Sequence, residues 1–197
     1  MRTVWIVAEY PNWFAGVAPL FNMLLAPYKG KPDLRYLQIG VYTGDASVWL
    51  LNNILTDASS TLTDVDTWEG SPDEDIHMQM DFEDVYATYK AKVEPYLNVR
   101  SVRNRSDNFL KAQKPNSYDF IYIDGDHTAK GTYDDAIGAW ACLAPNGILA
   151  FDDYTWGDGL EDQSKAPKPG IDQFLEEHTG KYTLLMMGYQ VWIQRNA

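Results

Sequence analysis

The sequence lacks the features that would cross-link it, hold it in a bilayer or attach it to nucleic acid. It contains a single cysteine, Cys142, which excludes an internal disulfide and a metal site built from several thiolates. No apolar run approaches the roughly 20 residues that span a bilayer. Acidic residues outnumber basic ones by 28 to 16, and the net charge of −12 repels a phosphate backbone. We therefore expect a cytoplasmic protein with no nucleic-acid or membrane partner.

What the chain does have is the composition of a globular domain with alternating strand and helix signals. Hydrophobic residues make up 45% of the 197 positions, which is enough for one sizeable core. Helical patterns separate consecutive apolar runs, and this alternation is typical of a parallel sheet with helices on both faces. The expected strands are 34–39, 60–65, 99–103, 119–124 and 148–152, and the expected helices are 46–55, 82–93, 107–112 and 132–143.

The C-terminal part of the chain breaks this alternation. Two apolar runs, 182–187 and 190–194, flank Gly188 and Tyr189 with no helix between them, which indicates a hairpin. The predicted fold class is therefore α/β: a doubly wound, Rossmann-like, mostly parallel seven-stranded sheet with an antiparallel terminal hairpin. Residues 1–33 are expected to form an N-terminal helical extension or cap, and residues 34–197 the main domain.

The turn after the first expected strand carries two glycines, Gly40 and Gly44, and helix-forming sequence follows it. Such a turn lets a ligand lie against bare backbone, with helix N–H groups directed at it. The dinucleotide pattern G-x-G-x-x-G would need glycines at 42 and 45. Tyr42 and Asp45 stand there instead, so the spacing disfavours an NAD-type pyrophosphate.

Two aspartates end the second expected strand. An acidic side chain at this position of a doubly wound fold can accept hydrogen bonds from both hydroxyls of a ribose. Asp66 lies 22 residues after Gly44, and Asp64 competes with it because the pleat places both on the same face. We favour Asp66, since it is nearer the carboxyl end of the strand, where ligands bind.

More carboxylates follow the fourth and fifth expected strands. Asp124 ends the fourth, with His127 three residues further on, and Asp152 and Asp153 end the fifth. Neighbouring parallel strands would bring these ends together, and clustered carboxylates are hard oxygen ligands suited to Mg²⁺, Mn²⁺ or Ca²⁺. The imidazole of His127 suits a general base near neutral pH.

Four segments, in this order, resemble the motifs of a known family. They are Gln38-Ile-Gly-Val-Tyr-Thr-Gly-Asp45, Asp66-Thr-Trp-Glu-Gly-Ser71, Ile123-Asp-Gly-Asp-His127 and Gly147-Ile-Leu-Ala-Phe-Asp-Asp-Tyr-Thr-Trp156. Together they resemble the class I S-adenosylmethionine (SAM)-dependent methyltransferases of the methyltransferase-24 type. That group is similar to the metal-dependent macrolide-sugar and catechol O-methyltransferases. The resemblance covers roughly residues 34–195.

The resemblance implies a role for each matching residue. Gly40 and Gly44 would pass under the methionine part of SAM, Asp66 would hold the ribose, and Ser106 would lie near the adenine. His127 would match the base of the sugar O-methyltransferases, where catechol-type enzymes have a lysine. The implied cofactor-binding set is Gln38, Gly40, Gly44, Asp66, Ser106 and Asp124; the catalytic pair is His127 and Asp124; and the metal ligands are Asp124, Asp152 and Asp153.

One position departs from the family pattern. The family usually has Glu or Asp just before the first glycine, whereas this chain has Gln38, whose amide lacks the charge that attracts the SAM ammonium group. The acceptor pocket would come from residues 1–30, 69–95 and 154–170, or from a second subunit. Exposed aromatic residues in the N-terminal segment are compatible with a homodimer.

The resemblance thus implies a SAM-dependent methyltransferase, in which Mg²⁺ or another divalent cation assists O-methylation of a small hydroxylated metabolite or sugar. Two alternatives stay open at this stage. The first is a metal-independent SAM methyltransferase acting on oxygen or nitrogen. The second is a non-catalytic module that binds SAM or a nucleotide.

Overall fold

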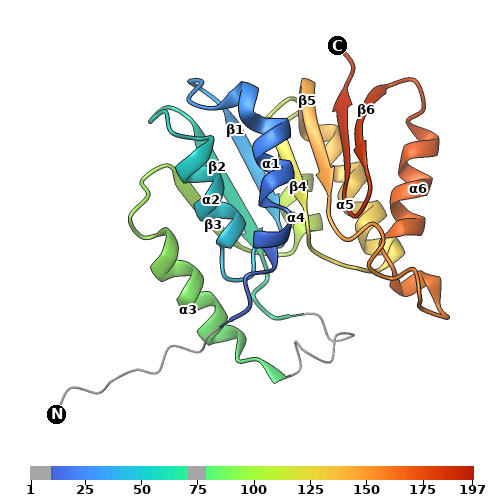
Figure 1. Cartoon of the computed structure of the whole chain (residues 1–197), viewed down its shortest axis with the longest axis horizontal. Helices are drawn as coiled ribbons and strands as arrows, with labels where there is room; N and C mark the ends of the chain where they lie inside the picture. The colour runs from blue at the N-terminus through green and yellow to red at the C-terminus, as the bar shows by residue number, and fades with distance from the viewer. Residues whose placement is uncertain (1–9, 71–78) are drawn as a thin grey trace.

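A computed structural model describes residues 10–70 and 79–197 and shows a seven-stranded mixed sheet (Figure 1). The strand order is β3-β2-β1-β4-β5-β7-β6. Strands β1 to β5 pair in parallel, whereas β7 pairs antiparallel with both β5 and β6. The strands are β1 Arg35–Ile39, β2 Thr61–Asp66, β3 Val99–Arg103, β4 Tyr118–Ile123, β5 Leu143–Phe151, β6 Tyr182–Met187 and β7 Val191–Arg195.

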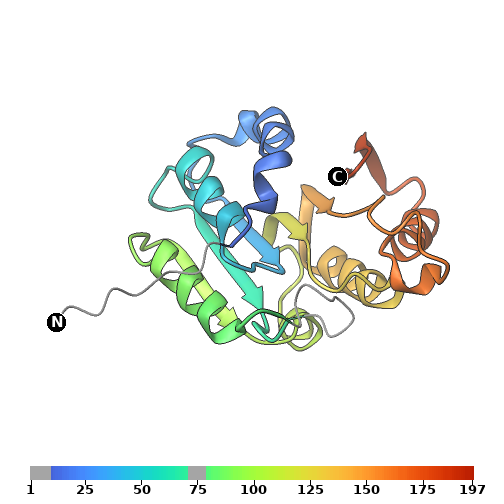
Figure 2. The ribbon, with the colours of Figure 1, turned by 60° about the horizontal axis from the view of Figure 1, so that its bottom comes forward.

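Helices cover both faces of this sheet (Figure 2). On one face lie α1 Ala18–Leu25, α2 Asp45–Asn53 and α3 Phe82–Val93, and on the other α4 Ser106–Lys111, α5 Ala129–Cys142 and α6 Lys168–Glu177. The residues that the structure describes also include the short 3-10 helices η1 Trp13–Gly16, η2 Ala26–Tyr28 and η4 Gln163–Lys165. The predicted fold class is confirmed.

The alternation of side chains along each strand divides the core into two halves. In β1, Leu37 and Ile39 pack under α5 and α6, whereas Tyr36 packs under α1 and α2. The fully buried Phe21 of α1 contacts the ring of Trp192 in β7, with 4.7 Å between ring centroids. The N-terminal helix is therefore part of the same core as the sheet.

The structure differs from the predicted elements mainly at two places. Helix α1 is not among the expected helices, and Pro19 occupies its first turn, where proline fits because no intrahelical N–H bond is lost. Helix α6 is also absent from the expected helices. It begins with Lys168, Pro169 and Gly170, which hide the helical pattern that follows. The predicted N-terminal cap falls partly on residues 1–9, and the 69–95 segment partly on 71–78, which lie outside the described residues.

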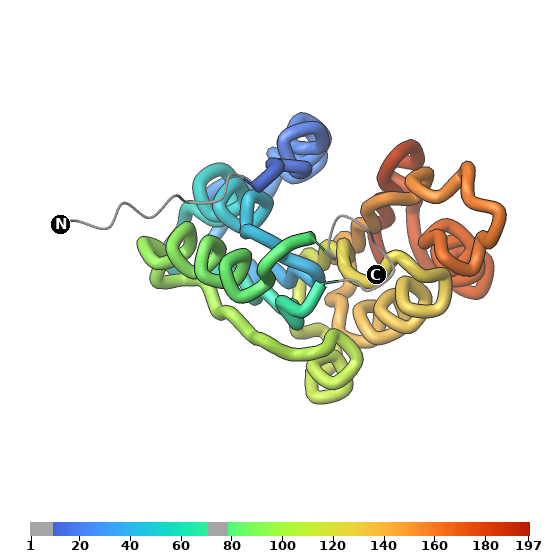
Figure 3. The backbone as a smooth tube through the Cα atoms, turned by 90° about the horizontal axis from the view of Figure 1, so that it is seen from below, coloured from blue at the N-terminus to red at the C-terminus, as the bar shows by residue number. Residues whose placement is uncertain are grey.

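The parallel strands all end on the same edge of the sheet, which faces the viewer in Figure 3. The β6–β7 turn reaches this edge too, because β7 runs antiparallel to β5 and therefore begins at the edge where β5 ends. All the loops that carry predicted site residues therefore converge on one edge. No helix within the described residues is long and apolar enough to cross a membrane.

Candidate functional site

The glycine turn between β1 and α2 is tightly packed against its neighbours. Gly40 and Gly44 both have φ of +79°, a conformation that glycine adopts without strain. A Cβ on Gly40 would lie 1.8 Å from the carbonyl oxygen of Asp124, and one on Gly44 would lie 2.7 Å from the ring of Tyr89. The turn therefore lies directly against the end of β4.

Gln38 braces this turn from inside the core. Its amide nitrogen donates to the carbonyl of Gly40 at 2.9 Å, and its amide oxygen accepts from the Ser47 hydroxyl at 3.2 Å. A carboxylate could not donate the first of these bonds. Gln38 is buried and holds the glycine turn in place. A substitution of Gln38 would therefore affect ligand binding by changing the conformation of this turn.

The structure separates the two aspartates that the sequence could not distinguish. Asp64 is fully buried and accepts a hydrogen bond of 2.9 Å from the Tyr89 hydroxyl. Asp66 is partly exposed at the end of β2, beside the glycine turn. Its carboxylate accepts from the backbone N–H groups of Val41, Tyr42 and Trp68 at 2.6, 3.0 and 2.7 Å. Asp66 is thus the accessible candidate, and it also fixes the turn.

Two aromatic residues adjoin the same turn. Trp13 of η1 stacks on Tyr42, with 4.6 Å between ring centroids, so the N-terminal segment lies against the glycine turn. Trp68 is buried and donates from its indole nitrogen to the carbonyl of Tyr42 at 2.9 Å. Trp13 thus contacts the side chain of Tyr42, and Trp68 contacts its backbone.

Ser106 is the first residue of α4 and lies beyond the end of β3. Its hydroxyl hydrogen-bonds to Asp135 of α5, a buried carboxylate close to Gly125. Burial raises the pKa of Asp135 to about 7, although the bond to Ser106 opposes the shift. The residue predicted to lie near the adenine therefore takes part in a polar contact between α4 and α5.

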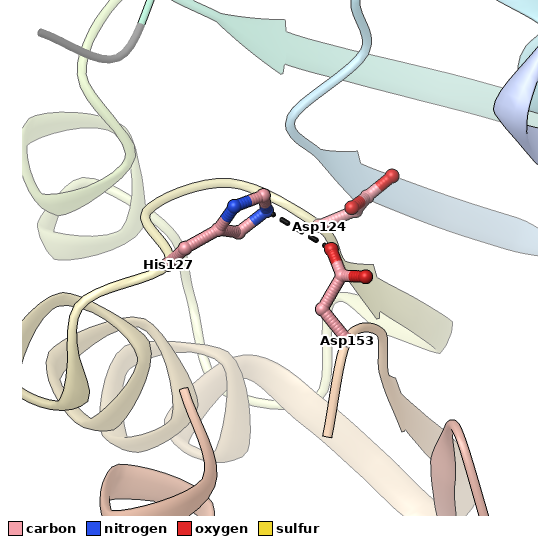
Figure 4. Close-up of side chains that lie close together, drawn as sticks. All are labelled: Asp124, His127 and Asp153. Atoms are coloured by element: carbon pink, nitrogen blue, oxygen red, sulfur yellow. Dashed lines mark ion pairs between the residues drawn. The ribbon is translucent and has the colours of Figure 1, made fainter. Parts of the chain in front are cut away.

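An acidic centre lies at the carboxyl ends of β4 and β5 (Figure 4). Asp124, His127 and Asp153 each direct one potential ligand atom to the same place, and these three atoms lie within 4.8 Å of one another. The Nε2 atom of His127 is 3.0 Å from Oδ2 of Asp153. Two carboxylates and one imidazole therefore meet where the sequence predicted a metal and a base.

The pKa values of the two carboxylates in this centre are shifted in opposite directions. Burial and the charges of Asp152 and Asp153 raise the pKa of Asp124 well above its usual range. Burial also acts on Asp153, but hydrogen bonds and charge from His127 and Tyr189 outweigh it and lower the pKa of Asp153. Asp124, Asp152 and Asp153 repel one another when they are ionised, and a bound cation would relieve this repulsion.

Asp152 has a different environment from the other predicted metal ligands. Its carboxylate accepts a hydrogen bond from the buried Tyr122 hydroxyl and another, of 2.8 Å, from the backbone N–H of Asp153. Asp153 has φ of +57°, which is unfavourable for a residue with a side chain. Asp152 therefore holds the backbone that directs Asp153 into the centre, and it is absent from the convergent group.

Two further aromatic residues border the centre. The ring of Trp156, 43% exposed, lies 5.1 Å from the His127 ring. Tyr189, 48% exposed, comes from the β6–β7 turn and donates its hydroxyl hydrogen bond to Asp153. The sequence placed Tyr189 only in a hairpin turn. The signal that could have found it is the antiparallel pairing, because a hairpin that returns beside β5 must bring its turn to the carboxyl edge.

Comparison with known proteins now identifies the family. The family described as methyltransferase domain, of the methyltransferase-24 type, matches residues 37–154, more than half of the chain. This chain belongs to that family. The predicted membership among the class I SAM-dependent methyltransferases is therefore confirmed.

Solved structures share the fold of this methyltransferase. An O-methyltransferase from Bacillus cereus in complex with SAH is 14% identical, with a TM-score of 0.63 over 97% of this chain and 84% of that one. A protein from Corynebacterium glutamicum is 17% identical, with a TM-score of 0.66 over 96% and 83%. An SAH-bound methyltransferase from Podospora anserina is 17% identical, with a TM-score of 0.58 over 83% and 71%. No curated protein matches the sequence.

The family match spans every site residue that the sequence predicted, from Gln38 to Asp153. Trp156 and Tyr189 lie outside it. The acidic centre of this methyltransferase therefore lies within the family-matched region, whereas the aromatic residues that border it, Trp156 and Tyr189, lie beyond that region.

Proposed function

We propose that this methyltransferase transfers a methyl group from SAM to a hydroxyl oxygen of a small hydroxylated metabolite or sugar, assisted by a divalent cation. The observation that carries the proposal is the convergence of Asp124, His127 and Asp153 beside the glycine turn. Gly40 touches the backbone of Asp124, so a cofactor on the turn would lie next to the acidic centre. The SAH-bound methyltransferases of the same fold support SAM as the donor.

The residues of the centre fit a hard divalent cation such as Mg²⁺ or Mn²⁺. Asp124 and Asp153 offer carboxylate oxygens, and the raised pKa of Asp124 reflects burial and repulsion by Asp152 and Asp153 that positive charge would relieve. When bound, such a cation supplies positive charge that favours the deprotonated form of an acceptor hydroxyl. Asp152 would contribute by holding Asp153 in place.

The chain's own residues would align the reactants and remove the proton. The glycine turn and Asp66 would fix SAM, so that the acceptor oxygen approaches the sulfonium carbon in line. His127 would accept the hydroxyl proton, and the Asp153 carboxylate, 3.0 Å away, would stabilise the resulting imidazolium. The His127–Asp153 pair also favours a second candidate, a metal-independent methyltransferase, because a base with its orienting carboxylate is already formed.

Calorimetric titration first tests cofactor binding, and activity assays then test methyl transfer. EDTA-treated protein is titrated with SAH and SAM, with and without Mg²⁺, and methyl transfer is then measured on sugars and catechols. We expect His127→Ala to lower kcat by roughly 10²–10⁴-fold, because a general base contributes about that much, and to leave SAH affinity unchanged. Asp153→Asn should remove the dependence of turnover on Mg²⁺.

The matched control is Asp134→Asn on α5, which removes an exposed carboxylate that pairs with Lys130 and should leave every value unchanged. Absence of SAH and SAM binding would refute the methyltransferase proposal for this chain. Activity that EDTA never reduces would favour the metal-independent candidate, and unchanged turnover of His127→Ala would remove the base assignment.

A further inference from the structure

The turn of the terminal hairpin is fixed beside the acidic centre by strand pairing. In the β5–β7 pair, Phe151 lies opposite Val191, and continuing this register by two residues places Asp153 opposite Tyr189. The backbone N–H of Tyr154 donates to the carbonyl of Tyr189 at 2.8 Å, so the two segments stay joined beyond the strands. The position of Tyr189 is thus set by the sheet and does not depend on the side chain.

The side chain of Tyr189 and the ring of His127 hold the two oxygens of Asp153 separately. The Tyr189 hydroxyl donates to Oδ1, and His127 Nε2 faces Oδ2 at 3.0 Å. Because each oxygen has its own partner, the carboxylate is restrained from rotating, and Oδ2 is the oxygen that faces His127.

We propose that Tyr189 is a positioning residue: its hydroxyl holds the Asp153 carboxylate so that Oδ2 remains directed at His127 and at a divalent cation. This inference rests on the proposed function, in which Asp153 serves both. The family-matched region ends at residue 154, so the restraint comes from the terminal hairpin and lies outside the family pattern.

Tyr189→Phe tests the inference, because it keeps the ring and removes only the hydroxyl. The matched control is Tyr154→Phe, which removes a hydroxyl that donates to Asp172 at 2.7 Å, whereas the Tyr189 hydroxyl donates to Asp153. Mn²⁺ alone is titrated into EDTA-treated protein and followed by electron paramagnetic resonance. A residue that orients a metal ligand typically affects affinity 10–100-fold, and we expect roughly ten-fold weaker Mn²⁺ binding in Tyr189→Phe only.

A second readout works without any cation. The ring nitrogens of the three histidines are observed by ¹⁵N NMR, and the His127 signals are assigned from their loss in His127→Gln. Tyr189→Phe should shift these signals, because Oδ2 of Asp153 is released from its defined position, whereas Tyr154→Phe should not.

The two readouts separate failure of this inference from failure of the proposed function. Wild-type protein that binds no Mn²⁺ contradicts the metal part of the proposed function, and the NMR comparison then decides the role of Tyr189. Wild-type Mn²⁺ affinity in Tyr189→Phe overturns the inference. Unchanged His127 signals in that variant overturn it as well.

Discussion

The aspartates at the carboxyl edge of the sheet differ in their burial and in their hydrogen-bond partners. Asp66 accepts from three backbone N–H groups, whereas Asp152 accepts from a phenol and fixes the strained backbone of Asp153. Asp153 faces a histidine, and Asp64 is enclosed beneath Tyr89. The positions of these aspartates at strand ends predict that they gather at this edge, and only the structure shows which of them face the centre and which hold the backbone.

Asp64 gives a prediction at this scale. Burial raises its pKa from 3.8 to about 7, so folding favours the protonated form. Its contribution to stability is fully present below about pH 4 and is lost as the pH rises to about 7. We expect Asp64→Asn to reduce this loss, and the wild type should lose up to about 4 kcal/mol more unfolding free energy between pH 4 and pH 8.

The measurement is urea unfolding of both proteins at a series of pH values. Asp134→Asn, which changes an exposed carboxylate, serves as the control and should follow the wild-type curve. Parallel pH profiles for wild type and Asp64→Asn would contradict the assignment. Because only the difference between profiles counts, the titration of Asp124, Asp135 and Asp152 does not enter the comparison.

At the scale of elements, the site depends on how closely the β1–α2 turn approaches the end of β4. Hydrogen bonds join the two directly: the N–H of Asp124 donates to the carbonyl of Ile39 at 2.8 Å. The parallel pairing of β1 with β4 brings the glycine turn and the first carboxylate together. This contact explains why the motifs around residues 40 and 124, far apart in sequence, act as one structural unit.

Gly40→Ala is therefore expected to be strongly destabilising. The added Cβ would lie 1.8 Å from the Asp124 carbonyl oxygen, and φ of +79° is strained for alanine. Overpacking and backbone strain together predict a loss of about 3 kcal/mol or more, measured by denaturant unfolding. Gly159→Ala, whose Cβ would meet nothing within 4 Å, is the control. A Gly40→Ala protein as stable as that control would show that the approach is looser than the structure indicates.

The whole molecule carries a net charge of −12, and its candidate site gathers several of those charges at one edge. A divalent cation could then stabilise the fold in two ways, by binding at the site or by screening the general repulsion. The two effects differ in concentration dependence, because a site saturates and screening follows ionic strength.

Thermal unfolding separates these effects. We expect Mn²⁺ at about 100 times its Kd to raise Tm by roughly 5–10 °C, because binding to the folded state alone stabilises it by mass action. NaCl at equal ionic strength should produce a smaller shift, and Asp153→Asn should respond to Mn²⁺ as to NaCl. Equal shifts in Mn²⁺ and NaCl for the wild-type protein would argue against a cation site.

The sequence by itself determined the fold class and the edge at which function would lie. Its strand and helix periods are local properties, and the terminal hairpin follows from apolar runs with no helix between them. Strand ends carrying Asp66, Asp124 and Asp153 then had to meet, since parallel strands share their carboxyl edge. The family followed from the order of four motifs.

Only the tertiary structure decided which of these residues converge and what restrains them. Pleat periodicity could not separate Asp64 from Asp66, because the distinction depends on the packing of α3 over the sheet. Likewise, Asp152 and Asp153 are adjacent in sequence, but the positive φ at Asp153 directs their side chains to different partners. The contact of Tyr189 with Asp153 joins residues 36 positions apart, and no local pattern encodes it. These contacts arise from packing between segments that are far apart in the sequence, and a local sequence pattern carries no information about such packing.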